Sequence, residues 1–369
     1  MDRGVTRGVT RGVTTWAPVA RRHRRLQAIG LFVRLSAVGG TLAMPLLGAA
    51  SVSPSLPWAT AGLLVVVALG FHLFAYLLND VVDLPIDRHE PRRAVSPLVR
   101  GTVGPGFTLV LALAGAAVGL AAAGWWGDGG GRGLGVLIVA FALMAVYDGW
   151  GKRSPVSWLL DLVQGLAWAS LFLWGAAERG PWTALTWWLF AFWTLFIVLA
   201  NGVHGGLRDL ANDARCGARS TAIAMGARAG GDGRIVIPRR TVVYAWALHG
   251  GLVALVVGAW AGGGLAYGFV ARGGTLLALA GLGAAGGWAL SAASRAGGEP
   301  ESLRLAGTLH LLLLMALPVA LLLPWLRPGF RIVTVVAFVA PLAALGWLPD
   351  VVRFIRARWI GNRGRRRCP

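Results

Sequence analysis

The chain has 369 residues, of which 56% are hydrophobic and only 14% charged, yet its formal net charge is +20. Soluble globular chains carry roughly 25% charged residues, so this composition excludes an ordinary soluble domain and favours a protein of the lipid bilayer. Nucleic acid is not expected as a partner, because the arginines gather in the termini and alternate loops and form no single basic stripe with interleaved aromatic residues.

Apolar stretches long enough to cross a hydrocarbon core of about 30 Å as helices recur along the chain. They lie approximately at residues 27–50, 58–78, 106–124, 133–147, 157–177, 183–203, 241–263, 273–293, 304–325 and 329–349. The last stretch contains Pro341 and ends at Pro349, so it is either a tenth span or a helix at the interface. The sequence therefore predicts an all-α fold, a polytopic transmembrane helical bundle of nine to ten spans.

Two basic tails flank the predicted transmembrane domain, which we place at residues 27–350. Residues 1–26 contain a tandem Arg-Gly-Val-Thr repeat and predict a disordered basic tail that contacts membrane lipids. Residues 351–369 form a second basic tail. Cytoplasmic segments of membrane proteins are enriched in arginine and lysine, so both tails and the basic loop 208–240 are expected in the cytoplasm. We expect an integral, multi-pass protein of the cell membrane.

A first polar motif stands where the second span meets the cytoplasmic surface, and it consists of Asn79, Asp80, Asp83 and Asp87. Carboxylates at positions i, i+3 and i+7 of a helix share one face. Crowded like charges repel unless a cation neutralises them, and Mg²⁺ suits such a set of oxygen ligands best. Pro85 kinks a helix, so the shared face is predicted securely only from Asn79 to Asp83. The alternative is a solvated acidic helix end that nearby arginines balance.

A second polar motif follows the sixth span. It contains Asp209 and Asp213, four residues apart on one potential helical face, next to Arg208. The span count places it on the same side of the membrane as the first motif, and the two motifs together hold five of the fifteen acidic residues of the chain. Two facing sets of carboxylates can hold two Mg²⁺ ions, which clamp a diphosphate and neutralise its developing charge.

The end of the fourth span, from Tyr147 to Arg153, carries the only lysine of the chain, Lys152. All other basic residues are arginine, so this position indicates a need for a compact ammonium group. Lys152 and Arg153 could grip a departing diphosphate, while Tyr147 could hydrogen-bond to a phosphate or flank a carbocation. The alternative is an ordinary positive anchor at the membrane surface.

These elements resemble those of the UbiA superfamily of intramembrane prenyltransferases. The first motif matches the family's first aspartate-rich motif in full. The second motif, with the glycine, serine and threonine that follow it, looks like the family's second motif. The element from Tyr147 to Arg153 is similar to the tyrosine-then-basic element that ends the family's fourth helix. The resemblance covers roughly residues 27–263 and implies a UbiA-type prenyltransferase fold with Mg²⁺ as cofactor.

By this resemblance, both motifs help to bind Mg²⁺ and the diphosphate of an isoprenyl donor. The implied metal ligands are Asp80, Asp83, Asp87, Asp209 and Asp213. The implied catalytic residues are Asp80, Asp83, Asp209, Asp213 and Lys152. The implied substrate-binding residues are Asn79, Tyr147, Arg153, Arg93, Arg100 and Arg208. Arg93 and Arg100 are included because Ser96 stands before Pro97, where family members often have arginine.

The predicted function is Mg²⁺-dependent transfer of an isoprenyl group from a prenyl diphosphate to an aromatic, quinone-precursor or lipid acceptor. A membrane terpene cyclase of the same superfamily is one alternative. An ion-coupled carrier is another, although carriers bind near the midplane and these acids cluster at one membrane face. The acceptor, the length of the prenyl chain and the oligomeric state stay open.

Two histidines, His72 and His204, lie within or at the end of apolar spans near the motifs. An ionisable group at such depth is by default a candidate for function. For His72, a hydrogen-bonded interior histidine is the favoured interpretation.

Overall fold

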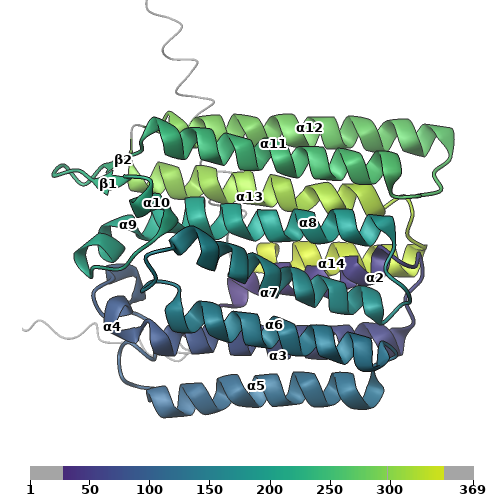
Figure 1. The fold of residues 1–369 in the computed structure, drawn as a ribbon, viewed down its shortest axis with the longest axis horizontal. Helices are drawn as coiled ribbons and strands as arrows, with labels where there is room; N and C mark the ends of the chain where they lie inside the picture. The colour runs from purple at the N-terminus through teal and green to yellow at the C-terminus, as the bar shows by residue number, and fades with distance from the viewer. Residues whose placement is uncertain (1–27, 297, 345–369) are drawn as a thin grey trace, which may run out of the picture.

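The structure is a computed structural model that describes residues 28–296 and 298–344. In this part of the chain, long helices run side by side along one direction (Figure 1). The longer helices are α2 (Val38–Ala50), α3 (Trp58–Val82), α5 (Pro105–Trp126), α6 (Gly130–Trp150), α7 (Ser157–Ala177), α8 (Ala184–Val198), α11 (Arg239–Gly262), α12 (Phe269–Ser294), α13 (Pro300–Leu322) and α14 (Pro328–Ala344). The shorter elements are η1 (Leu35–Ala37), α4 (Leu84–Asp87), η2 (Pro91–Arg93), the π-helical segment η3 (Leu199–Gly205), α9 (Gly206–Arg215), α10 (Thr221–Ala224), β1 (Arg228–Ala229) and β2 (Ile235–Val236).

Eight helices among the described residues are long and apolar enough to cross a membrane. They correspond to eight of the predicted spans. The first and last predicted spans are represented by the shorter apolar helices Leu35–Ala50 and Pro328–Val339. The prediction of a multi-pass helical bundle is therefore confirmed, whereas both predicted tails, 1–26 and 351–369, lie outside the described residues.

The predicted span 27–50 is not one continuous helix in the structure. Arg34 has a left-handed backbone conformation (φ 45°), and the turn there separates a short helical stretch from η1 and α2. His72 stabilises this turn, since its Nε2 lies 2.8 Å from the carbonyl oxygen of Val33, to which it donates. The break therefore has a packing partner, and it directs the Arg34 side chain toward α3.

The outer face of the bundle is apolar. Helix α5, at the edge of the bundle in Figure 1, exposes Phe107, Val110 and Leu113 at intervals of three residues. Residues at this spacing share one side of a helix. A continuous apolar face of this kind is stable against hydrocarbon, because all backbone groups are satisfied within the helix.

Glycine allows α2 and α7 to pack backbone against backbone. A Cβ atom on Gly175 of α7 would meet the backbone of Pro45, and one on Gly48 of α2 would meet the carbonyl group of Phe172. Small residues at helix crossings permit this close approach in membrane bundles, where van der Waals contact supplies much of the association energy.

One end of the bundle, at the left in Figure 1, collects α4, α9, α10 and the antiparallel pair β1–β2. The connection after α3 touches the one after α8, because the Asn212 side chain on α9 donates to the carbonyl oxygen of Ile86 on α4 (3.1 Å). The two polar motifs are thus brought to the same end of the bundle.

The close contact at Gly175 generates a stability prediction. Replacing Gly175 with alanine should lower the thermal midpoint in detergent, because overpacking a helix crossing costs about 1–3 kcal/mol. The matched control is Gly135→Ala on α6, where an added Cβ atom meets nothing within 4 Å. Equal thermal midpoints for the two variants would contradict the packing described for α2 and α7.

Candidate active site

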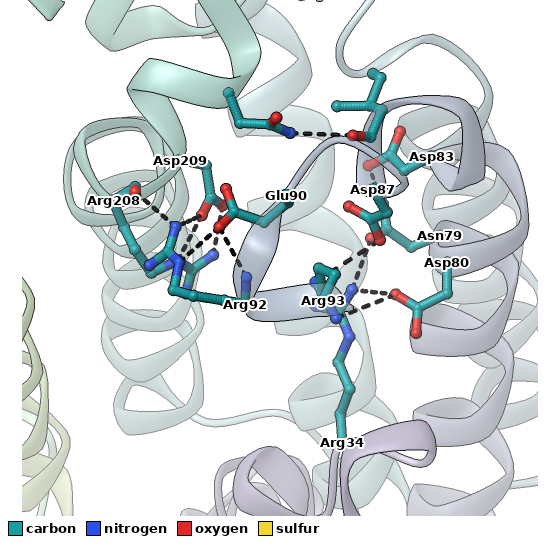
Figure 2. Close-up of polar contacts among 12 residues, drawn as sticks. Arg34, Asn79, Asp80, Asp83, Asp87, Glu90, Arg92, Arg93, Arg208 and Asp209 are labelled. Atoms are coloured by element: carbon teal, nitrogen blue, oxygen red, sulfur yellow. Dashed lines mark hydrogen bonds and ion pairs between the residues drawn. The ribbon is translucent and has the colours of Figure 1, made fainter. Parts of the chain in front are cut away.

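The first motif spans the end of α3, the junction residue Asp83 and the short helix α4. Pro85 lies in the first turn of α4, where its missing N–H removes no hydrogen bond that the helix would make. The backbone N–H of Asp87 donates to the carbonyl oxygen of Asp83 (2.9 Å), so the chain keeps a nearly helical path. Asp80, Asp83 and Asp87 are all buried and gather at this bend (Figure 2). The kink therefore does not disperse the carboxylates.

Arg34, for which the sequence suggested no role, reaches the first motif from the turn before η1 (Figure 2). Its Nη2 pairs with the carboxylate of Asp80 and donates to Oδ1 of Asn79 (3.3 Å). Its guanidinium carbon lies 5.1 Å from the ring centroid of Tyr76. Its Nε is buried and has no hydrogen-bond partner among the described residues. The sequence contained one signal for this role, because Arg34 is a charged residue inside an apolar stretch and such residues usually mark functional sites.

The second motif lies on α9, and arginines tie it to the loop after α4. Arg208 holds the carboxylate of Asp209 with Nε (3.0 Å) and Nη2 (2.7 Å). Arg92 donates from Nη2 to Asp209 Oδ1 (3.3 Å) and from Nε to Glu90 Oε1 (2.9 Å). Figure 2 shows the side chains of Glu90, Arg92, Arg208 and Asp209 gathered in one cluster.

Lys152 bridges the two motifs. Its Nζ lies 3.4 Å from Asp83 Oδ2 and 3.2 Å from Asp213 Oδ1. Burial alone would lower the pKa of Lys152, but the carboxylates of Asp83 and Asp213 outweigh it and raise that pKa. Burial raises the pKa of Asp83, and the Lys152 ammonium opposes this rise. The only lysine of the chain is thus a charged, compact link between both acidic motifs.

A cavity of about 440 Å³ lies between the motifs and extends into the bundle. Its polar end is lined by Arg34, Asn79, Asp83, Asp87, Arg93, Tyr147, Lys152, Asn201, Arg208, Asp209 and Asp213. Its apolar walls include Met44, Trp168, Phe196, Leu290 and Met315. A charged end joined to apolar walls fits a molecule with an anionic head and a hydrocarbon tail.

A buried hydrogen-bond network fixes Tyr147 at the cavity. Asn201, on the π-helical segment η3, donates from Nδ2 to Asp161 Oδ1 (2.7 Å) and to Tyr147 Oη (2.9 Å). The hydroxyl of Thr221 donates to the second oxygen of Asp161. Because Tyr147 Oη accepts from Asn201, its own hydrogen is available to a further acceptor. π-Helical turns occur frequently at functional sites.

The remaining predicted residues divide into two groups. Arg93 lines the cavity. Its Nη1 lies 3.7 Å from Asp80 Oδ1, and its Nε lies 3.7 Å from Asp87 Oδ2. Arg100 donates from Nε to a backbone carbonyl of its own loop (3.0 Å). Arg153, which follows α6, donates to the carbonyl oxygens of Gly149 on α6 (2.9 Å) and of Val82 on α3 (3.4 Å). Neither Arg100 nor Arg153 belongs to the described lining of the cavity.

The oxygen ligands at the polar end fit Mg²⁺. Within the described residues, no group of three or more His, Cys, Asp or Glu side chains is arranged to hold a metal ion. Mg²⁺ needs no such group, since proteins usually bind it through one or two carboxylates together with substrate phosphates. Asp148, which was not among the predicted site residues, accepts from Asn79 through Oδ1 (3.3 Å) and has a buried Oδ2 without a described partner. A buried carboxylate oxygen without a partner is stabilised by a nearby cation or by a proton.

Comparison with solved structures shows which known proteins share this fold. A UbiA homolog from Aeropyrum pernix K1 shares 19% identity with a TM-score of 0.56, over 78% of this chain and 97% of that chain. A UbiA homolog from Archaeoglobus fulgidus bound to GPP and Mg²⁺ shares 17% identity with a TM-score of 0.55, over 79% of this chain and 99% of that chain. A digeranylgeranylglyceryl phosphate synthase shares 16% identity with a TM-score of 0.58, over 81% and 98% of the two chains.

Similarity at these levels of identity establishes the shared fold. No curated protein matches the chain. The family model described as the UbiA prenyltransferase family matches residues 37–296, which include both acidic motifs and the bridging lysine. This protein therefore belongs to the UbiA prenyltransferase family.

Proposed function

We propose that this protein transfers an isoprenyl group from a prenyl diphosphate to an acceptor within the membrane and releases pyrophosphate. The observation that carries the proposal is one cavity with a highly charged end and apolar walls, in which Lys152 joins Asp83 to Asp213. Similar structures from Archaeoglobus fulgidus are bound to GPP and Mg²⁺ or to DMAPP and Mg²⁺, which supports a diphosphate donor.

The acidic side chains would hold Mg²⁺ together with the diphosphate. The proposed ligands are Asp80, Asp83, Asp87, Asp209 and Asp213. When bound, the metal neutralises the charge that develops on the leaving oxygen. Asn79 positions the first motif, because its amide contacts Arg34 (3.3 Å), Asp83 (3.4 Å) and Asp148 (3.3 Å).

The basic side chains contact the diphosphate oxygens directly in this proposal. Arg34 has a buried Nε without a described partner, and Arg93 and Arg208 line the same end of the cavity. Arginine forks match the geometry of phosphate oxygens, while the ammonium of Lys152 acts as a compact charge. Tyr147 donates its hydroxyl hydrogen to a phosphate oxygen, since its oxygen already accepts from Asn201.

The apolar walls protect the reacting carbon. Ionisation of the donor produces an allylic cation that water would capture, so exclusion of water favours transfer to the intended acceptor. Trp168 and Phe196 line this part of the cavity, and Met44 and Met315 contribute flexible thioether side chains. We place the polar end at the cytoplasmic face, because the basic loop 208–240 lies beside it.

A carrier function receives no support from the position of the acids. The motifs lie at one end of the bundle in Figure 1, whereas carriers bind ions and substrates near the midplane. A terpene cyclase would use the same donor site, so only the products separate it from a transferase.

Removing one motif carboxylate tests the donor site. Asp213→Asn keeps the shape of the side chain but removes the charge that faces Lys152, and Mg²⁺-dependent release of pyrophosphate from geranyl diphosphate should fall by about 100-fold or more. The control is Asp232→Asn in the turn between β1 and β2, where the side chain is 66% exposed. Full activity of the Asp213 variant would remove that residue from the mechanism.

Substitution of the adjacent residues Lys152 and Arg153 tests which of the two cations serves the site. Lys152→Ala should reduce turnover strongly, because two buried carboxylates lose their shared partner, whereas Arg153→Ala should retain most of the activity, since Arg153 contacts backbone carbonyls. Pyrophosphate release and thermal midpoints of both variants would be measured in the same detergent. A greater loss of turnover in the Arg153 variant would contradict the proposed arrangement of cations.

Product analysis separates transferase from cyclase. With geranyl diphosphate and Mg²⁺ alone, we expect slow formation of the linear alcohol, and a large rise in pyrophosphate release when phenolic acids or lipid alcohols are added as acceptors. Mass spectrometry of the extracts would identify the prenylated acceptor. A cyclic hydrocarbon formed from the donor alone would instead establish the cyclase.

A further inference from the structure

Three histidines form a hydrogen-bonded chain apart from the charged cluster. His204 Nε2 lies 2.9 Å from His310 Nδ1, and His310 Nε2 lies 3.0 Å from His249 Nδ1. The three residues come from η3, α13 and α11, so the chain runs laterally from helix to helix. His310 is fully buried and His249 is 7% exposed. Buried ionisable groups in a membrane bundle are costly and typically mark a pathway or a site.

The chain connects two hollows. At one end, His204 and Gly307 line the cavity that contains the acidic motifs. A Cβ atom on Gly307 would lie 2.7 Å from His204 Nδ1, so glycine leaves the room that this nitrogen needs. At the other end, His249 lines a groove between α11 and α12, together with Trp246 and Trp288.

The donors in this chain must point in one direction. Each of the two hydrogen bonds needs one N–H group, and a neutral imidazole has only one. If both outer rings donated to His310, that ring would be an anion. Of the two aligned arrangements, the one in which His204 donates to His310 leaves His204 Nδ1 as a free acceptor at the cavity and puts the last hydrogen on His249 Nε2. A proton that arrives at His204 can move along the chain by one hop at each bond.

We propose that His204 is the general base of prenyl transfer and that His310 and His249 relay the proton it receives. This inference rests on the proposed function and adds the chemical class of the acceptor. The acceptor must be a nucleophile that gives up a proton as it reacts, such as a hydroxyl group or an activated aromatic C–H group.

An electron pair of the acceptor forms the bond to the allylic carbon, and the C–O bond of the donor breaks with its pair leaving on pyrophosphate. The acceptor proton passes to His204 Nδ1, while the Nε2 proton of His204 moves to His310 Nδ1. The Nε2 proton of His310 then moves to His249 Nδ1. The positive charge thus reaches His249. When pyrophosphate leaves, the same hops in reverse return the proton to His204 and then to pyrophosphate, which restores the three rings to their starting tautomers.

His204 suits this task better than the carboxylates of the cavity. Those carboxylates are paired with Lys152 or arginines, as Asp83 and Asp209 are, and they serve the diphosphate site. A neutral imidazole can accept a proton without losing a counterion. Among the described residues that line the cavity, His204 is the only histidine.

Water is the smallest acceptor that must lose a proton, so hydrolysis of geranyl diphosphate to geraniol tests the relay. The variants are His204→Gln and His310→Leu, the second of which leaves His204 at the cavity but cuts the chain. The control is Thr275→Val on α12, which removes a buried hydroxyl that bonds only to its own helix (2.8 Å). Geraniol formation is measured in H₂O and D₂O, and binding of geranyl diphosphate with Mg²⁺ is measured by thermal shift.

Both histidine variants should lower kcat for geraniol at least about 10-fold, because general bases contribute roughly 10²–10⁴-fold. They should retain the KM and the thermal shift of the wild type and lose its solvent isotope effect, while the Thr275 variant changes none of these. Geraniol formation at the wild-type rate in His204→Gln, or its absence in the wild type, overturns the relay. If the wild type shows no thermal shift with the donor, the proposed function itself fails.

Discussion

The site depends on the neutralisation of closely spaced carboxylates at one end of an apolar bundle. Charges in a medium of low dielectric interact strongly, so unpaired acids at this depth would destabilise the fold. Lys152 lies between Asp83 and Asp213 and neutralises both carboxylates. Arg34 and Arg208 pair with neighbouring carboxylates. In the proposed function, the same cations also donate hydrogen bonds to phosphate oxygens. The same cations are therefore needed both to stabilise the folded site and to bind the proposed diphosphate.

Three interruptions of regular helix present the polar groups. The left-handed turn at Arg34 sends a guanidinium into the site, and the junction at Asp83 keeps three carboxylates together despite Pro85. The π-helical segment η3 carries both Asn201, which holds Tyr147, and His204, which begins the histidine chain. The long helices form a rigid frame, and the interruptions between them direct polar side chains into one cavity.

Hydropathy and spacing predicted the helical bundle, both acidic motifs and the lysine between them, because these signals are local in the sequence. The break at Arg34 was missed, since the stretch is apolar and its partner His72 lies on another helix. The histidine chain joins residues 106 and 61 positions apart, so only tertiary packing reveals it. Arg153 was predicted to bind the substrate because it follows Lys152. Sequence position does not give the direction of a side chain, and in the structure Arg153 donates to backbone carbonyls.

The proposed function requires the two acidic motifs and their cations to form one Mg²⁺-dependent diphosphate site. Calorimetric titration of the wild-type protein with geranyl thiodiphosphate, a donor analogue that resists ionisation, tests it most directly. We expect one binding site per chain in the presence of Mg²⁺ and a large loss of affinity when EDTA removes the metal. Equal affinity with and without Mg²⁺, or no binding at all, would contradict it.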